Sequence, residues 1–366
     1  MPSRKRSSIP PLAAPMTRGK FLGALGGSLA ALALGPRLGG IARADTPESP
    51  QSPAAAAPID CFRPGQPWLD TDGVPINAHG AGLLHDGDRY FWYGEFKVGG
   101  DAGNSAQVGI SCYSSTDLYN WKNEGIVLPV TAEPGSDLER GCILERPKVL
   151  RNAANGTFVL WCHYERKGHG YDSAQVAIAV ADNPRGPFRL RRILRPNGEM
   201  SRDMTLFLDE EGTAWHVRSS EGNATMQLAR LTPDYLDCEP DVVRIMEHSY
   251  PEAPALIFHD GWYHMIASHC SGWAPNPARR AVAQSVAGPW KELGNPAVGD
   301  KSDITFNSQS TFLLKPAGTD VVIYLGDRWQ PKNPIDGTYI WLPLELSGTD
   351  AALRWRDSWR LSDVVT

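Results

Sequence analysis

The sequence predicts an all-β fold of the five-bladed β-propeller type. From residue 60 onward there is no amphipathic helical periodicity, only short β-rich runs separated by Gly, Asp, Asn and Pro. A turn followed by an aromatic or aliphatic strand recurs five times, at residues 86–93, 155–161, 211–217, 260–266 and 318–324. Repeats of roughly 50 to 70 residues built from short strands are typical of propeller blades. A β-sandwich is the alternative, but it does not need this recurrence.

A second pattern follows the turn-and-strand motif in three of the repeats. Small and polar residues lead to an aromatic side chain, at Trp121, Phe188 and Trp290. Each such segment would return a strand to the outside of its sheet. We expect the aromatic side chain to pack between neighbouring sheets.

The first 59 residues differ in composition from the rest of the chain. Residues 1–44 contain seven basic side chains, no acid and an apolar run at 21–34, and they end in Ala42-Arg43-Ala44. This pattern predicts an export signal peptide, because the apolar run is short for a membrane span. Residues 45–59 are rich in Pro, Ala and Ser and predict a disordered linker. The propeller is expected at 60–366, in a secreted or periplasmic protein.

Charge restricts the partners. The whole chain has a net charge of −5, and removing residues 1–44 leaves 29 basic and 41 acidic side chains, a net charge of −12. Nucleic acid and anionic membranes are therefore excluded as predicted partners, because phosphate binding needs clustered Lys and Arg. A neutral ligand is favoured.

The six cysteines show no CxxC spacing, which argues against a zinc site. Disulfides and free buried thiols both remain open. We find no clear ligand set for a metal, and no cofactor is predicted.

Polar side chains stand just before the strand motif in every repeat. The inner strands of a propeller converge on one axial pocket, so residues at these places should meet although they are far apart in sequence. They are His79, Glu145 with Arg146, Asp203, Glu252 and Gln309.

Glu252 lies in a stiff segment between Pro251 and Pro254, from which a side chain is aimed reproducibly. With Glu145 it forms a pair of carboxylates suited to glycoside hydrolysis. In that reaction one carboxylic acid protonates the leaving oxygen, and a second polar group positions water on the opposite face of the sugar. The alternative for Glu252 alone is an ordinary solvated loop carboxylate.

Other residues are predicted to bind the substrate, each against a structural alternative. The alternatives are an ion pair for Arg146 and Asp203, and a satisfied buried imidazole for His79. Trp273 and Trp329 are expected to stack on a sugar ring, or else to pack between blades. The complete predicted set is His79, Glu95, Arg146, Asp203, Trp273, Arg328 and Trp329.

Seven motifs follow one another in a fixed order, namely AHGAGLL, YFWYGE, LERPKVL, SRDMTLF, YPEAPALIF, SGWAPN and NSQSTFLL. In this order they resemble the motifs of the five-bladed propellers of glycoside hydrolase family 43, and most closely those of its branch of exo-β-1,3-galactanases and related galactosidases. The resemblance covers about residues 70–345.

The resemblance implies an inverting, exo-acting hydrolase that releases terminal β-linked galactose from an oligo- or polysaccharide. It implies that Glu252 is the general acid and that Glu145 orients it and raises its pKa by like-charge repulsion. Most of the family has a first-blade aspartate as base, but this chain has His79 there. The galactanase-like branch shares that absence, and its last-blade glutamine, here Gln309, is implied to position water, either through an imidic tautomer or by orientation alone.

The residues themselves do not select the sugar. Family members also act on arabinofuranosides, xylosides and galactofuranosides, so these activities are alternatives. The missing first-blade aspartate keeps a further alternative open, a non-catalytic carbohydrate-binding propeller.

Overall fold

The computed structural model of this protein describes residues 57–364, which belong to one compact unit, Ser52–Thr366. The predicted export signal and all but residues 57–59 of the predicted linker lie outside the described residues. Within residues 57–364, no helix is long and apolar enough to cross a membrane.

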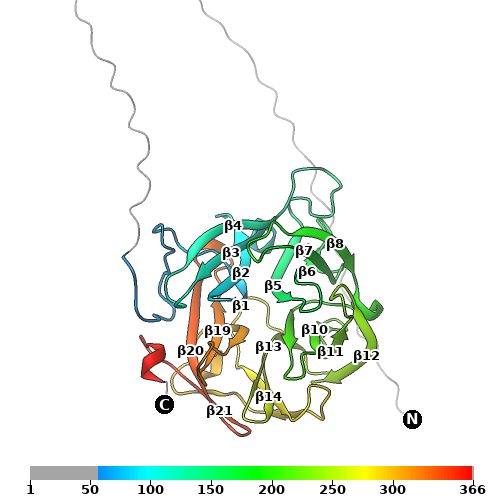
Figure 1. Ribbon diagram of the computed structural model, residues 1–366. Coiled ribbons are helices and arrows are strands. Elements are labelled where there is room, and N and C mark those ends of the chain that lie inside the picture. The colour runs from blue at the N-terminus through cyan, green and yellow to red at the C-terminus, as the bar shows by residue number, and fades with distance from the viewer. Residues whose placement is uncertain (1–56, 365–366) are drawn as a thin grey trace, which may run out of the picture. The chain divides into compact units, whose positions relative to one another are not determined.

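The unit is a five-bladed β-propeller, as predicted (Figure 1). Blade one consists of β1 (His79–Asp86), β2 (Arg89–Lys97), β3 (Gln107–Ser115) and β4 (Lys122–Pro129). Blade two consists of β5 (Ile143–Arg151), β6 (Phe158–Glu165), β7 (Gln175–Ala181) and β8 (Arg189–Leu194). Blade three consists of β9 (Met204–Leu208), β10 (Ala214–Ser220), β11 (Thr225–Leu231) and β12 (Cys238–Ile245). Blade four consists of β13 (Pro251–His259), β14 (Trp262–His269), β15 (Arg279–Ala283) and β16 (Lys291–Leu293).

Blade five has an extra strand at its outer edge. It consists of β18 (Gln309–Leu314), β19 (Val322–Arg328), β20 (Thr338–Ser347) and β21 (Asp350–Arg354), with β17 (Ala297–Val298) added in parallel to β21. All other strand pairs are antiparallel and follow chain order outward, so β1, β5, β9, β13 and β18 surround the axis.

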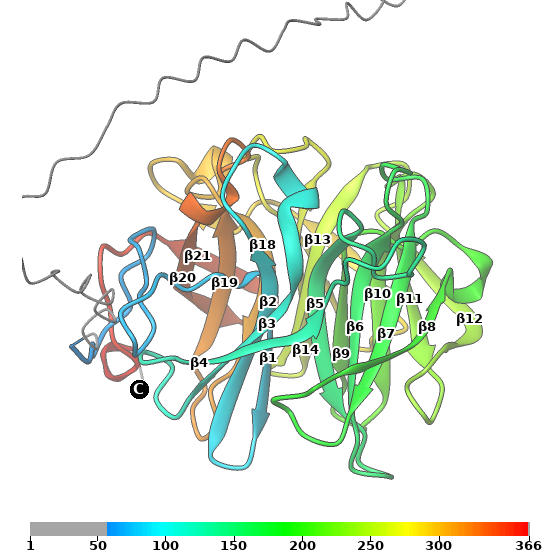
Figure 2. The ribbon, with the colours of Figure 1, turned by 90° about the horizontal axis from the view of Figure 1, so that it is seen from above.

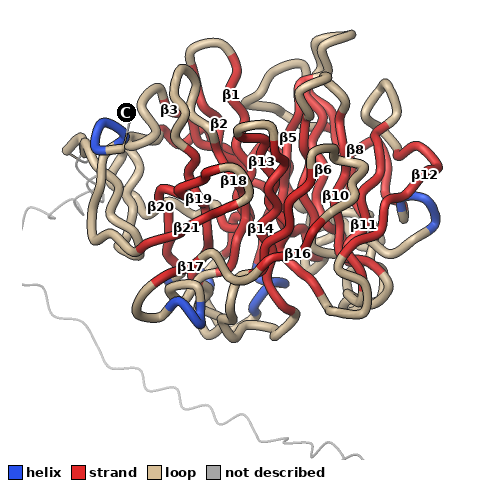
Figure 3. Tube along the Cα trace, turned by 90° about the horizontal axis from the view of Figure 1, so that it is seen from below, coloured by secondary structure: helices blue, strands red, loops and turns tan. Residues whose placement is uncertain are grey.

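In the described part of the chain, helix is confined to short 3₁₀ turns, four between strands and one after the last strand (Figure 3). They are η1 (Gly103–Ala106), η2 (Pro196–Gly198), η3 (Ser302–Ile304), η4 (Pro334–Asp336) and η5 (Leu361–Asp363).

The five predicted turns connect the inner two strands of the five blades. Gly87 and Gly261 occupy them with φ of 64° and 78°, values that L side chains rarely adopt. The strands that follow supply alternate apolar side chains to the layers between blades. Trp121, Phe188 and Trp290 pack into three of those layers, which agrees with the expectation from their pattern.

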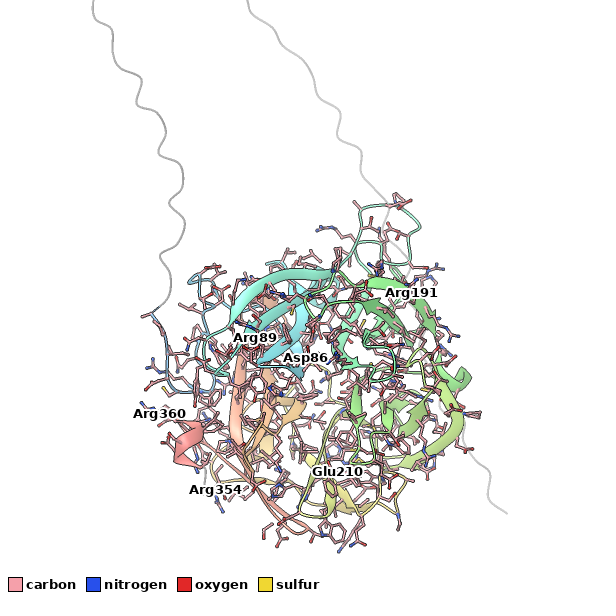
Figure 4. All side chains as sticks on the ribbon, viewed as in Figure 1. Asp86, Arg89, Arg191, Glu210, Arg354 and Arg360 are labelled. Atoms are coloured by element: carbon pink, nitrogen blue, oxygen red, sulfur yellow. The ribbon has the colours of Figure 1, made fainter. Side chains whose placement is uncertain are left out.

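Both ends of the described chain meet at the junction of blades one and five. Phe62 pairs with Trp359 through two backbone hydrogen bonds of 2.9 and 3.1 Å, and their ring centroids are 4.5 Å apart. Asp60 forms an ion pair with Arg360, and Figure 4 labels Arg360 at the outer rim of the propeller. Since each blade is made of one continuous segment, these contacts join the last blade to the first.

All six cysteines are unpaired, and four of them are buried. Of the two possibilities left open by the sequence, the structure has free thiols.

Candidate active site

A cavity of about 350 Å³ lies where the inner strands begin, and its lining comes from all five blades. The loops at this end are the upper ones in Figure 2. Eight predicted residues line it, namely Glu95, Glu145, Arg146, Asp203, Glu252, Trp273, Gln309 and Trp329. Six polar lining residues were not predicted, namely Asn104, His163, Tyr171, Arg202, Asn223 and Cys270.

Glu145 and Glu252 occupy equivalent places in blades two and four. Each is followed by a residue with positive φ, Arg146 at 52° and Ala253 at 57°, and then by a proline. In both strands the ladder shifts register immediately after the glutamate, which marks a β-bulge. Bulges bend a strand and re-aim its side chains, so both carboxylates are turned into the pocket.

A carboxylate from the preceding blade holds each bulge. The N–H of Arg146 donates to Oε1 of Glu95 at 3.0 Å, and the N–H of Ala253 donates to Oδ2 of Asp203 at 3.0 Å. Blade one repeats the arrangement, since the N–H of Gly80 donates to Oδ2 of Asp327 at 2.6 Å. The positive-φ residue is therefore fixed by a charge-assisted hydrogen bond in three blades.

Glu252 is the carboxyl group most suited to be protonated near neutral pH. Burial raises its pKa, the charge of Asp203 raises it further, and the value reaches about 7. The charge of Glu145 also raises this pKa, but its contribution is the smallest of the three. The increase that was predicted to come from Glu145 therefore comes mainly from burial and Asp203. Asn223 donates to Oε1 of Glu252 at 2.6 Å and orients the group.

Glu145 is the opposite case. Burial, the largest single effect, would raise its pKa, but His163, Tyr171 and Lys97 together outweigh burial and lower the pKa to about 2. Nδ1 of His163 lies 2.9 Å from Oε2 of Glu145, and the hydroxyl of Tyr171 donates to Oε1 at 2.7 Å. On its other side Nε2 of His163 contacts Glu165 at 2.8 Å. The two carboxylates raise the pKa of His163 to about 9 although burial opposes this, so Glu145 faces an imidazolium.

Gln309 is held by three partners. Its Oε1 accepts from Nη2 of Arg146 at 2.7 Å and from Nε1 of Trp329 at 2.9 Å, and its Nε2 donates to Ser268 at 3.0 Å. Arg146 in turn pairs with Asp203 at 2.8 Å. The second N–H of the Gln309 amide has no hydrogen-bond partner among the described residues, and Gln309 lines the pocket.

Aromatic side chains form part of the wall. The rings of Trp273 and Trp329 meet edge to face with centroids 5.8 Å apart, and Trp273 is 40% exposed. Tyr171 is 39% exposed and accepts from Asn104 at 2.7 Å. Such exposed rings beside polar groups suit the apolar faces and hydroxyls of a sugar.

Two residues predicted to bind substrate do not line this pocket. His79 is 2% exposed, lies 3.3 Å from Asp327 and stacks on Tyr339, so it is a satisfied buried imidazole. Arg328 donates to the backbone carbonyls of Phe306 and Asn307 and lines a different cavity.

A buried layer of charge supports the pocket floor. Lys97 pairs with Glu95 at 2.6 Å and donates to Asn104 at 2.9 Å. Lys148 donates to the carbonyl of Gly80 at 3.0 Å, and burial together with the charge of Arg146 lowers the pKa of Lys148 to about 7.

One group among the described residues has the spacing of metal ligands, namely Glu145, His163 and Asp203. Its members already have partners, because His163 is shared by two carboxylates and Asp203 pairs with Arg146. A protonated imidazole offers no lone pair to a metal, so this donor set does not suit a cation.

The unpredicted residues carried weak sequence signals. His163 lies in the middle of an apolar strand, and its pairing opposite Glu145 depends on register. Asn104 and Tyr171 come from long connections after β2 and β6, whose folded positions have no local pattern. An aromatic or amide residue in such a loop is not distinctive by itself.

The family model of glycosyl hydrolases family 43 matches residues 81–339. Among curated proteins there is no significant match.

Several solved structures are similar to this chain. A family 43 β-1,3-galactosidase, solved with galactodeoxynojirimycin, is 41% identical with a TM-score of 0.79, over 82% of this chain and 100% of that chain. The exo-β-1,3-galactanase of Phanerochaete chrysosporium, solved with β-1,3-galactotriose, is 34% identical with a TM-score of 0.76, over 83% of this chain and 68% of that chain. The exo-β-1,3-galactanase of Clostridium thermocellum is 35% identical with a TM-score of 0.75, over 81% and 66% of the two chains.

Proposed function

This chain belongs to glycosyl hydrolases family 43 and is a glycosidase, and on that premise we propose that it is an inverting, exo-acting enzyme releasing terminal β-1,3-linked galactose. Its substrates are galactans or arabinogalactan-type glycans. Support for the sugar comes from relatives whose names specify β-1,3-galactosidase or exo-β-1,3-galactanase.

One observation carries the chemistry. Two carboxyl groups at equivalent places in two blades line one pocket, and their pKa values lie on opposite sides of the ordinary value, about 7 for Glu252 and about 2 for Glu145. Pairs of carboxyl groups whose environments separate their pKa values are typical of glycosidase sites. Glu252 is therefore the group that can donate a proton near neutral pH.

In the proposed reaction, the carboxylic acid of Glu252 protonates the leaving glycosidic oxygen while the bond to the anomeric carbon breaks. Asn223 holds the acid through Oε1, which leaves Oε2 to carry the proton. Glu145 stays ionised beside His163, and its negative charge favours the oxocarbenium-like transition state.

Gln309 positions the attacking water. Its Oε1 already accepts two hydrogen bonds, from Arg146 and Trp329. An imidic tautomer would place a hydrogen on that oxygen, where it would meet the hydrogens of these two donors. This favours orientation over tautomerisation. The second N–H of the amide donates to one lone pair of the water and leaves the other lone pair for the anomeric carbon. As the new C–O bond forms, the water passes its proton to solvent water in the open pocket, and Glu252 regains a proton from solvent after the leaving group departs.

Closure of the pocket on one side favours exo action. The loop after β2 contacts the loop after β19 through Gly100, whose N–H donates to Asn333 at 2.9 Å. It contacts the loop after β6 through Asn104 and Tyr171. A cavity closed by three blades in this way accepts the end of a chain more easily than its middle.

The direct test is incubation with β-1,3-galactan and with aryl β-galactosides, α-arabinofuranosides, β-xylosides and β-galactofuranosides. We expect galactose as the product, first appearing as the α-anomer in proton NMR spectra because the enzyme inverts. Initial β-anomer would contradict inversion. Preference for a pentoside or galactofuranoside would replace galactose as the sugar.

We also propose that the protein is exported. The support is the composition of residues 1–44, with basic residues, an apolar run and an A-x-A sequence. Expression of the full chain followed by N-terminal sequencing should find Asp45 as the first residue of exported protein. Full-length protein retained inside the cells would contradict export.

A further inference from the structure

A second cavity, of about 450 Å³, lies in blade five beside the extra strand β17. Its chemically distinctive lining is three basic side chains, two aromatic rings and one acid, namely Lys301, Arg328, Arg354, Phe306, Trp355 and Asp300. Arg354 is labelled at the periphery of the ring in Figure 4, away from the axis. The cavity is therefore separate from the catalytic pocket.

Positive charge gathers here in an otherwise acidic domain. Residues 57–366 contain 29 basic and 39 acidic side chains, yet the cavity has three cations against Asp300 alone. Lys301 makes no ion pair with any residue in 57–364, and Arg354 has only a 3.5 Å contact to the exposed Glu345. Two of these cations are thus available to an anionic ligand.

Arg328 is held in place before any ligand arrives. Its Nε and Nη2 donate to the carbonyls of Asn307 and Phe306 at 3.2 and 2.8 Å. Its guanidinium carbon lies 5.9 Å from the centre of the Trp355 ring. A guanidinium fixed over an aromatic ring is a pre-organised cation, since little side-chain entropy is lost on binding.

Trp355 offers a flat apolar surface next to these charges. It is 38% exposed, its Nε1 donates to Asp357 at 2.8 Å, and Phe306 packs against it with centroids 5.8 Å apart. The ring is therefore fixed in orientation but open to solvent. A fixed tryptophan face beside cations matches a pyranose ring that carries an acidic group.

This cavity shares a wall with the catalytic pocket. Arg328 precedes Trp329, which lines that pocket and donates to Gln309. The carbonyl of Asn307, which Arg328 binds, lies two residues before Gln309. Neighbouring residues of blade five thus line both cavities, Trp329 the catalytic pocket and Arg328 the second cavity.

We propose that the blade-five cavity binds an anionic sugar residue, carboxylated or sulfated, on the polysaccharide that the enzyme degrades. The cations hold the acidic group and Trp355 stacks on the ring. The inference rests on the proposed function for the identity of the polysaccharide, but not for the preference for negative charge.

The test compares charged and neutral ligands by isothermal titration calorimetry. The full chain with Glu252→Gln is titrated with a β-1,3-galacto-oligosaccharide bearing glucuronic acid, with its carboxyl-reduced form and with a sulfated galacto-oligosaccharide. We expect about fivefold tighter binding of the acidic forms, as for partly exposed ion pairs, and loss of the difference at 1 M salt. The acidic ligand that binds more tightly shows whether the cavity prefers a carboxylate or a sulfate. Equal affinity for all three would overturn the proposal.

Charge reversal locates the site. In Lys301→Glu and, separately, Arg354→Glu, the affinity ratio of acidic to neutral ligand should fall to about one. Lys291→Glu, an exposed lysine on β16 that lines neither cavity, should keep the fivefold ratio. An unchanged ratio in both cavity variants would overturn the proposal. Hydrolysis of neutral β-1,3-galactobiose by the unmodified enzyme tests the proposed function separately, because it involves no acidic sugar.

Discussion

Glu145 in blade two and Glu252 in blade four share one local design and have opposite electrostatics. Both stand in the sequence Glu-X-Pro at the start of an inner strand, both precede a positive-φ residue, and both are followed by a bulge. The pKa of Glu145 is lowered to about 2 and that of Glu252 is raised to about 7.

Part of the difference originates on the next strand. The residue paired with Glu145 is His163, a cation, and the residue paired with Glu252 is Ser268, which is neutral. Asp203 adds a negative charge near Glu252. The backbone thus delivers two identical groups to one pocket, and the charges beside each group, the imidazolium of His163 next to Glu145 and the carboxylate of Asp203 near Glu252, separate their pKa values.

The largest effect that would test this difference is expected for Glu252→Gln. This change keeps the shape but removes the proton donor, so kcat/KM on β-1,3-galactobiose should fall about 10³-fold. On a dinitrophenyl β-galactoside, whose leaving group needs no protonation, the loss should be much smaller. Steady-state kinetics on both substrates check this, and full activity on the disaccharide would show that Glu252 is not the acid.

Removal of the cation should make the two glutamates more alike. In His163→Gln, Glu145 and Glu165 lose their shared imidazolium, so the pKa of Glu145 should rise and kcat at pH 5 should fall about 100-fold. The protein should also lose about 3 kcal/mol of stability, because buried charges are left unpaired.

Urea denaturation measures the stability part of this prediction. The matched control is Arg189→Gln, which breaks an exposed pair with Asp182 and should change stability by less than about 0.5 kcal/mol. Equal effects of the two variants would mean that His163 has no special electrostatic role.

A smaller effect is expected when a cation is added opposite Glu252, at the position of Ser268. In the unmodified enzyme, activity should fall as pH rises through about 7, because Glu252 must be protonated. Ser268→His places an imidazole opposite Glu252, so this alkaline limb should move to lower pH and the rate at pH 7 should drop about tenfold. Ser268→Ala removes the hydrogen bond from Gln309 without adding charge, and should leave the limb in place. A pH–rate profile for each variant decides between charge and packing.

The smallest expected effects are on thermal stability, and they have opposite signs for Glu252→Gln and Glu145→Gln. The pKa of Glu252 in the folded protein lies above its ordinary value of 4.5, so the contribution of this group to folding stability falls as pH rises from about 4.5 to 7. Glu252→Gln should therefore raise Tm at pH 8 by about 3 °C but leave it unchanged at pH 4. The folded pKa of Glu145 lies below 4.5, so its stabilising effect is present above pH 4.5 and lost toward pH 2. Glu145→Gln should therefore lower Tm at pH 7 by about 3 °C but not near pH 2. Calorimetry at the stated pH values checks both, and shifts of the same sign would contradict the comparison.

The sequence was informative where a residue's place in the repeat determines its place in space. Glu145, Glu252 and Gln309 all lie at the starts of inner strands, and strands around one axis converge. His163 was missed because its role depends on strand register, which the sequence of β6 does not reveal.

Two predicted residues, His79 and Arg328, lie outside the pocket lining for a clear physical reason. Successive side chains of a strand point to opposite faces, and on β19 it is Asp327 that faces Gly80 and His79. Arg328 therefore faces away from the axis and lines the blade-five cavity. His79 has the same place in β1 as the two glutamates have in theirs, but Asp327 and Tyr339 enclose it.

The hydrogen bond between Gly80 and Asp327 has a consequence for how the molecule is made. Its donor and acceptor are 247 residues apart, and the acceptor belongs to the last blade to be synthesised. Until then the first blade has an unsatisfied bulge and the pocket lacks Gln309. The site therefore cannot assemble without the fifth blade, so closure of the ring and completion of the pocket depend on the same segment of the chain.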